Sequence, residues 1–407
     1  MRPDYQSRIA KFNPTLNTFV DLSGEAQGEG LSWAAKSNIA VKGLPWTAGC
    51  EAYRDRIADR DASVIASIRE SGGTVLGTVN MHEGALGATT DNQAYGRTQN
   101  PWRTGLTPGG SSGGSGAAVA AGLCDVALGT DTMGSVRIPA AYCGVQGHKP
   151  TTGLVSDDGV IPLSTSLDHV GPLARNVETL WTAMHILAGW SQDTVLEPHA
   201  LEGLKIGIWT GDKAVTLTPS VERGMAAAAD IIKAAGALTS DFVPPVYDYS
   251  RSRRSGLLVS EIEGAKEHGV TENGPRPEGL SDIFYQLLHW GVRQSAEKVE
   301  AAYDHIQDVH GAAAKVWEDV DFIIAPTAPQ EAFAFDMDAP ANQADFTAWA
   351  DFARLPATAL YCGLNEAGLP LSLQVIGPEG KDRDTLRVAA ALEALFGQPP
   401  MPPGYEW

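Results

Sequence analysis

Two serines and one lysine in this sequence have the types and surroundings that nucleophilic catalysis requires. Ser111 lies in the glycine-rich segment 109–115, Ser135 follows 24 residues later, and Lys36 lies well upstream of both. A serine hydroxyl is a poor nucleophile at neutral pH unless a neighbouring base accepts its proton. Lys36 is flanked by apolar residues, and burial would lower the pKa of its amine and make it usable as that base. The three residues therefore offer a nucleophile, a relay hydroxyl and a base without any histidine.

The segment Gly129–Ser135 could also supply hydrogen-bond donors to a reaction intermediate. It follows a predicted buried strand, and the successive backbone N–H groups of a turn there could converge on one point, as an oxyanion requires. We expect these donors to be the N–H groups of Thr132, Met133, Gly134 and Ser135. Simpler interpretations stay open at this stage. The segment could be an ordinary tight turn, and Lys36 could pack its stem in the core while its ammonium reaches water.

The glycine-rich segment 109–115 is a poor candidate for the interior of a strand or helix, because glycine loses much conformational freedom on ordering. Residues 110–114 also fit the Gly-x-Ser-x-Gly nucleophile elbow, with Ser112 in the centre. That elbow requires a strand directly before it, and the preceding residues 102–108 are polar and end in proline. A phosphate-binding loop would need Gly-Lys-Ser/Thr after the glycines, which this sequence lacks. We therefore expect a loop that brings backbone close to a reactive group.

The segments around these residues predict alternating helices and strands. We expect helices at 64–72, 113–122, 179–189, 221–236 and 385–396, and helical structure through 281–318 with candidate breaks at Gly291 and Gly311. We expect strands at 74–79, 124–129, 204–209, 321–326 and 371–376. This alternation indicates an α/β core with both sheet faces covered. No long linker marks a boundary, so a single domain over residues 1–407 is predicted.

The composition is that of a globular protein and limits its partners. The chain has 407 residues, of which 43% are hydrophobic and 19% charged, with a net charge of −19. Such a charge repels phosphate backbones and anionic lipids, so we expect no nucleic-acid or membrane partner. The first residues lack the apolar core of a signal peptide, and the four cysteines are widely spaced. These features favour a cytoplasmic protein without a disulfide framework.

The acidic and histidine residues do not form a metal-binding pattern. Glu263 and Glu267 share a predicted helix face, but Lys266 lies beside them and the face is expected to be solvated. His305 and His310 are five residues apart and so do not lie on one helix face. We predict no metal and no cofactor.

Several segments in order resemble the amidase signature family. They are residues 35–39, 108–115, 129–137, 139–151 and 166–175, and the spacing between the two serines also matches. The similarity extends from about residue 31 to residue 376 and is densest between residues 74 and 175. The resemblance implies the α/β fold of that family, a single large domain whose central mixed β-sheet is covered by helices on both faces.

The resemblance also implies roles for the three residues named first. Ser135 would be the nucleophile that becomes acylated, Ser111 the bridging serine and Lys36 the terminal base. Members of the family hold the bridging serine after a cis peptide, here Gly110–Ser111. Neutral Lys36 would accept the proton of Ser111, which in turn would accept that of Ser135 as it attacks an amide carbonyl.

Further residues are implied as supports or as substrate contacts. Ser112 is expected to help hold Lys36, whereas Asp131 and Arg137 are expected to support the loop and not to react. By the same resemblance, the substrate-binding residues would be Met81, Gly109 and Gly110.

Three positions depart from the family pattern. Ser37 stands where aspartate usually follows the lysine, and the loss of that carboxylate favours the neutral amine. Met133 replaces a common glycine, and it either shapes the acyl pocket or fills a gap. His148 stands where an apolar residue is typical, and we expect it to be a structural histidine with its polar atoms satisfied.

The predicted function is hydrolysis of a small-molecule carboxylic amide, carbamate or urea at its C–N bond through a Ser135 acyl-enzyme. The alternative is the amidase subunit of a glutamine-dependent tRNA amidotransferase, which would pass ammonia to a partner. The short segment before Lys36 and the compact region 190–320 argue against this alternative. A catalytically silent binding protein is a third hypothesis, disfavoured because all three residues are present. The oligomeric state stays open, with a homodimer as one alternative.

Overall fold

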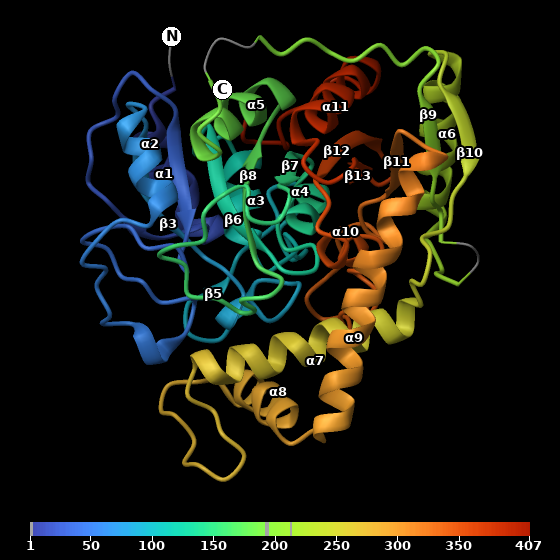
Figure 1. Ribbon diagram of the computed structural model, residues 1–407. Helices are drawn as coiled ribbons and strands as arrows, with labels where there is room; N and C mark the ends of the chain where they lie inside the picture. Colours follow the sequence, from blue (N-terminus) through green and yellow to red (C-terminus); the bar gives the residue numbers. More distant parts are fainter. Residues whose placement is uncertain (1–2, 192–194, 212–213) are drawn as a thin grey trace.

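A mixed sheet of eleven strands organises the chain (Figure 1). The computed structural model describes residues 3–191, 195–211 and 214–407. Within this part the strand order is β1-β3-β2-β6-β8-β7-β12-β13-β11-β9-β10. The strands are β1 (Phe19–Leu22), β2 (Ser32–Lys36), β3 (Thr74–Val79), β6 (Val126–Asp131), β7 (Gln146–Lys149), β8 (His169–Ala174), β9 (Lys205–Ile208), β10 (Leu238–Asp241), β11 (Phe322–Pro326), β12 (Ala357–Leu364) and β13 (Pro370–Ile376). The short strands β4 (Asp91–Asn92) and β5 (Gly96–Arg97) form a separate pair.

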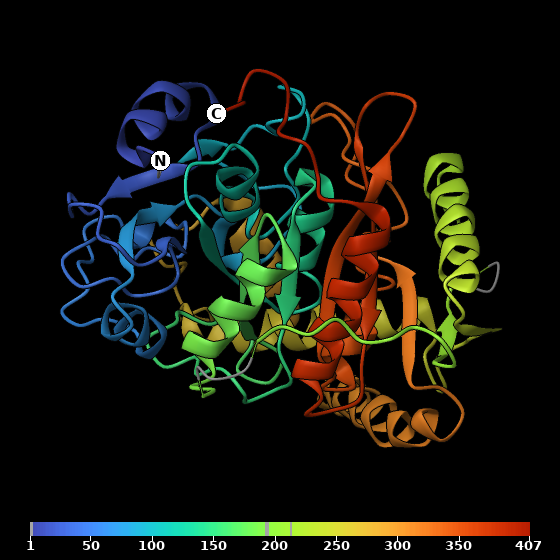
Figure 2. The same ribbon diagram turned by 90° about the horizontal axis from the view of Figure 1, so that it is seen from above.

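Helices cover both faces of the sheet, as predicted. On one face, apolar residues of α2 (Ser63–Glu70), α5 (Val177–Leu187), α6 (Pro219–Ala234) and α11 (Asp382–Phe396) share one core. On the other face, α1 (Tyr5–Leu16), α3 (Gly113–Ala120) and α4 (Arg137–Cys143) build a second core. Figure 2 shows α1 and α6 at opposite ends of the sheet.

The helices α8 (Asp282–Val292) and α9 (Ala296–Ala313) each pack against α7 (Tyr249–Glu267), which lies across the lower end of the sheet in Figure 1. The predicted helical region 281–318 is therefore two helices followed by the 3₁₀ turn Ala314–Glu318. The break lies at residues 293–295 because Ser295 caps α9 by accepting the Lys298 N–H. Gly311 lies inside α9, so the break expected there is wrong. Next to α9 lies the short α10 (Ala348–Phe352).

Strand β6 lies two residues later than predicted. Asp125 is not part of it, because its carboxylate accepts the Ser32 N–H and its own N–H donates to the Ser32 carbonyl. At the other end, Thr130 and Asp131 pair with β8 opposite Val170 and His169. Both residues, expected in a turn, are therefore held in the sheet.

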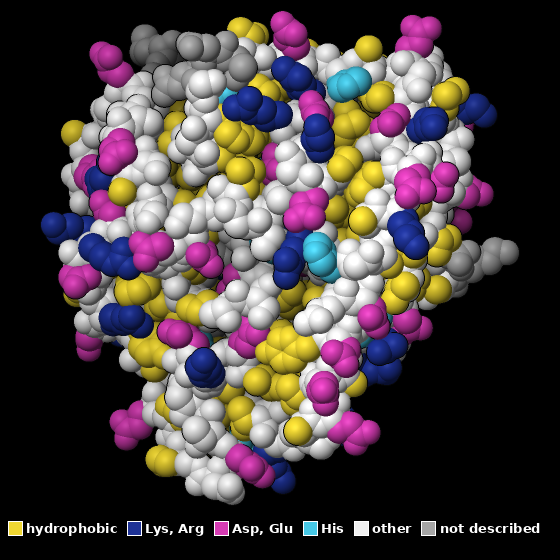
Figure 3. All heavy atoms as spheres, viewed as in Figure 1, with side chains coloured by type: hydrophobic (Ala, Val, Ile, Leu, Met, Phe, Trp, Pro, Cys, Tyr) yellow, Lys and Arg dark blue, Asp and Glu magenta, His cyan; other side chains and the backbone are white. Residues whose placement is uncertain are grey.

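The surface shows no single concentration of charge on the face drawn in Figure 3, where basic side chains are interspersed with acidic ones. Across the described ranges, every helix is too short or too polar to traverse a bilayer.

Candidate active site

Lys36 is the last residue of β2, and its side chain lies on the face that α3 covers. Side chains alternate along a strand, so Lys36 shares this face with Ala34, which belongs to the core formed with α1, α3 and α4. β2 pairs in parallel with β6, and the residues that follow β6 carry the predicted nucleophile. The lysine and the 132–135 loop therefore meet at the carboxyl edge of two neighbouring strands.

The Lys36 amine is fully buried among hydroxyl groups. Its Nζ lies 2.7 Å from Ser111 Oγ and 2.8 Å from Thr130 Oγ1. Burial lowers the pKa of Lys36 to about 7, although the charges of Asp168 and Asp131 oppose this shift. A substantial fraction of the amine is thus neutral near pH 7. The alternative in which Lys36 reaches water is wrong, because its exposed fraction is 0%.

Ser111 and Ser112 sit where the glycine-rich loop enters α3. The Gly110–Ser111 peptide is cis. Ser112 Oγ donates to the Thr130 carbonyl and accepts the Thr130 N–H. A Cβ on Gly129 would lie 2.8 Å from Ser112 Oγ, so glycine there permits this close approach. Ser112 was expected to hold Lys36, but its bonds go to the backbone of Thr130, whose side chain contacts the amine.

Ser135, the predicted nucleophile, lies beside this loop. Its carbonyl accepts the Ser112 N–H at 3.2 Å, which ties the two serine-bearing segments together. The predicted oxyanion donors need one correction. The Gly134 N–H donates to Asp131 Oδ1 at 2.5 Å and is therefore already engaged. The N–H groups of Thr132, Met133 and Ser135 stay as the predicted donors.

Asp131 and Arg137 form a buried support under this loop. Besides Gly134, Asp131 accepts the N–H of Val136 and two guanidinium N–H groups of Arg137. Arg137 also donates to Asp351 and to Gln374. Burial alone would raise the pKa of Asp131, but the adjacent guanidinium outweighs it and holds the pKa well below its usual range. A carboxylate with this many donors is suited to holding the loop in place.

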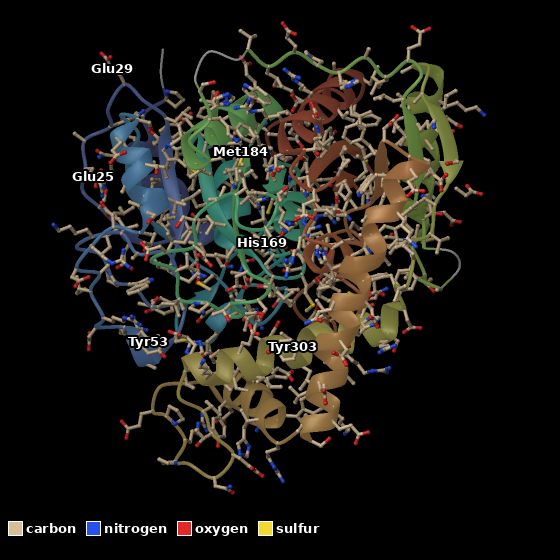
Figure 4. All side chains as sticks on the ribbon, in the orientation of Figure 1. Glu25, Glu29, Tyr53, His169, Met184 and Tyr303 are labelled. Carbon is tan, nitrogen blue, oxygen red and sulfur yellow. The ribbon has the colours of Figure 1, made fainter. Side chains whose placement is uncertain are left out.

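Asp168 and His169, to which the sequence analysis assigned no role, contact the loop that carries Ser135 and the end of β6. Asp168 accepts the Thr132 hydroxyl at 2.6 Å and the N–H groups of Leu163 and Ser164. Its burial raises its pKa to about 6. His169, labelled on β8 in Figure 4, binds the Asp131 carbonyl through Nδ1, and burial lowers its pKa to about 3, so the ring is neutral. Both residues lie in the segment 166–175 that resembles the amidase signature family, and this resemblance was the feature of the sequence that could have identified them.

Ser135 opens onto a cavity of about 130 Å³ between the loop, α7 and residues 340–344. Its lining is mostly apolar and includes Ala85, Leu86, Gly87, Ala88, Gly110, Thr132, Met133, Ile138, Leu163, Arg253, Leu257, Ser260, Pro340, Ala341, Gln343 and Ala344. Of the three predicted substrate-binding residues, only Gly110 lines it. Met81 is fully buried in a core with Phe284, and the carbonyl of Gly109 accepts the Thr90 hydroxyl.

The remaining sequence expectations concern metals and His148. Over the described ranges, no three His, Cys, Asp or Glu side chains gather as a metal ion would require. His148 is buried, with Nδ1 bound to Thr358 and Nε2 3.3 Å from Asp382. Its polar atoms are satisfied within the fold, as expected of a structural histidine.

Comparisons with known proteins identify the family of this chain. The family model described as Amidase matches residues 29–386. The chain is 31% identical to the A subunit of glutamyl-tRNA(Gln) amidotransferase from Synechococcus sp. (strain RCC307), over 97% of this chain and 94% of the relative. The crystal structure of the same enzyme's A subunit from Thermotoga maritima superposes with a TM-score of 0.86 at 29% identity, over 98% of this chain and 93% of the other. A 6-aminohexanoate cyclic dimer hydrolase complexed with substrate gives a TM-score of 0.85 at 26% identity, over 96% and 92%. The chain belongs to the amidase signature family.

Proposed function

We propose that this protein cleaves the C–N bond of a carboxylic amide through an acyl-enzyme on Ser135. One observation carries the proposal: a fully buried lysine with a pKa near 7 lies 2.7 Å from the Ser111 hydroxyl, in the loop beside Ser135. An amine of this kind is a base at neutral pH.

The reaction would proceed by proton relay. Neutral Lys36 accepts the Ser111 proton as Ser111 Oγ accepts the Ser135 proton, and Ser135 Oγ forms a bond to the amide carbon. The tetrahedral oxyanion is held by the N–H groups of Thr132, Met133 and Ser135, which are fixed in place before the reaction. The proton then returns through Ser111 to the nitrogen as the C–N bond breaks, and ammonia or an amine leaves.

The acyl group is then transferred to water by the same relay. Water loses a proton toward Ser111 and Lys36, attacks the ester carbon, and Ser135 recovers its proton as the acid departs. Arg253 is the one charged residue among the described residues that line the cavity, and it already binds both oxygens of Asp345, so its charge is largely compensated. The mostly apolar lining favours an amide with an uncharged acyl group.

A second candidate has support from the relatives. They are named as A subunits of glutamyl-tRNA(Gln) amidotransferase, and this favours an amidotransferase component over a hydrolase that works alone. Ammonia released at Ser135 would then pass to a protein partner. With a net charge of −19, this chain is unsuited to bind tRNA itself, so the partner would bind it. Against this candidate, the alignment spans 461 positions while the chain has 407 residues, so segments of the relative have no counterpart here.

Turnover by the isolated chain separates the two candidates. The purified protein is assayed with glutamine and with aliphatic amides, anilides, carbamates and ureas, and ammonia or amine release is measured. We expect hydrolysis of uncharged amides, with kcat lowered on the order of 10⁶-fold in Ser135→Ala. Activity confined to glutamine would favour the amidotransferase component. Undiminished turnover in Ser135→Ala would refute the assignment of the nucleophile in both.

A further inference from the structure

Met133 forms the part of the cavity wall that lies between Ser135 and α7. Its backbone is fixed on both sides, because its carbonyl accepts the Thr347 hydroxyl at 2.5 Å and the preceding Thr132 hydroxyl donates to Asp168. With the loop held in this way, the Met133 side chain leaves it in a defined direction and lines the cavity.

The thioether of Met133 lies directly against Gly256 of α7. A Cβ on Gly256 would be 2.3 Å from Met133 Sδ and 2.7 Å from the tip of Phe352. Gly256 is buried in the middle of a helix of 19 residues, where glycine is less favourable than alanine by about 0.5–1 kcal/mol. The space that this glycine leaves is filled by the Met133 side chain. The methionine and the glycine therefore act as a matched pair.

This pair limits how far an acyl chain can extend from Ser135. The cavity of about 130 Å³ is slightly smaller than the engineered cavity of ~150 Å³ that accommodates benzene. An acyl chain that extends toward α7 meets the four heavy atoms of the Met133 side chain. Leu257 and Ser260 continue the same wall along α7.

Building on the proposed amidase function, we propose that Met133, seated on Gly256, sets the maximum acyl length, so that the substrates are amides of short, uncharged acids. In well-formed apolar pockets, one methylene changes kcat/KM by about 10–200-fold. A steep fall in rate is expected at the first carbon that the pocket cannot hold.

The test is a series of primary amides from propionamide to octanamide. For the wild type we expect kcat/KM to fall at least about tenfold at one step of the series. In Met133→Ala we expect this fall in kcat/KM at an acyl chain that is two or three carbons longer. In Gly256→Ala the new methyl group displaces the thioether toward the cavity, and the step is expected at a shorter chain. Met184→Ala, a buried methionine on α5, controls for general loosening of the core and should leave the position of the step unchanged.

A binding measurement keeps this inference separate from the proposed function. The affinity of each amide is measured by calorimetry with Ser135→Ala protein, with and without Met133→Ala. A shift of the length limit in binding supports the inference even if turnover of the wild type is absent, and that absence would count against the proposed function. An unchanged length limit in both turnover and binding would overturn the inference. A limit that moves equally in Met184→Ala would also overturn it.

Discussion

Replacing Lys36 by methionine should change the pH dependence of stability in a direction fixed by its burial. The folded-state pKa of Lys36 is about 7, against 10.5 for an exposed lysine. Between these values the unfolded chain binds a proton that the folded chain does not, so the free energy of unfolding of the wild type rises with pH. Burial of Lys36 lowers the free energy of unfolding of the wild type by about 4 kcal/mol at pH 7, and this destabilisation disappears near pH 10.5. Methionine abolishes this titration.

The quantity to measure is the difference in the free energy of unfolding between Lys36→Met and the wild type. Methionine leaves the hydroxyls of Ser111 and Thr130 without their amine, which costs a fixed amount at every pH. The test is therefore how this difference in the free energy of unfolding changes with pH. The size of the difference at any one pH does not test the argument. From pH 7.5 to pH 9.5 we expect the difference to fall by about 2–3 kcal/mol, because only the wild type gains stability from this lysine over that range.

Urea unfolding at pH 7.5, 8.5 and 9.5 measures this difference. Ser135→Ala is the control, since it removes activity but keeps the lysine, and it should follow the wild type at each pH. A difference that stays level from pH 7.5 to pH 9.5 would show that Lys36 titrates alike in both states. That result would refute the argument from burial. In the active enzyme, the same lysine predicts that kcat/KM rises with pH to a plateau, with a midpoint near pH 7.

Two further predictions concern buried carboxyl groups. The charge of Asp168 raises the pKa of Lys36, so Asp168→Asn should move the acid limb of the kcat/KM profile to lower pH, and an upward shift would contradict this. Glu261 on α7 is buried without a partner at its Oε2, and burial raises its pKa to about 8. The wild type should lose stability from pH 5 to pH 8 as the unfolded chain releases that proton, so Glu261→Gln should gain in relative stability over this interval. Urea unfolding at several pH values measures the gain, and a difference independent of pH would rule it out.

Sequence reasoning predicted the elements that carry strong local patterns. Strand 74–79 was predicted with the bounds of β3, and the helices at 113–122 and 221–236 agree with α3 and α6 to within two residues. Helix α7 had no comparable prediction because it is buried on more than one side. Ser252, Gly256 and Ser260 face other elements along with apolar residues, so its apolar period is weak.

The parts of the site that the sequence missed depend on pairing between distant strands. Thr130 contacts Lys36 because β2 lies beside β6, and His169 reaches Asp131 because β8 pairs with β6 in the opposite direction. No local pattern specifies either neighbour. The position of Gly134 was misjudged for a similar reason. A turn with several N–H groups was predicted, but the carboxylate of Asp131 that accepts one of them could not be foreseen from spacing alone.

Because Lys36 is the last residue of β2, catalytic activity depends on the register in which β2 pairs with β6. If β2 slid by one residue against β6, every side chain on it would exchange faces, and the amine would point toward the layer that contains α2 and α5. Such a molecule would keep nearly all of its helices, so circular dichroism would barely distinguish it from the native form. Active-site titration of a refolded sample would instead count only the molecules in which β2 and β6 pair in the native register.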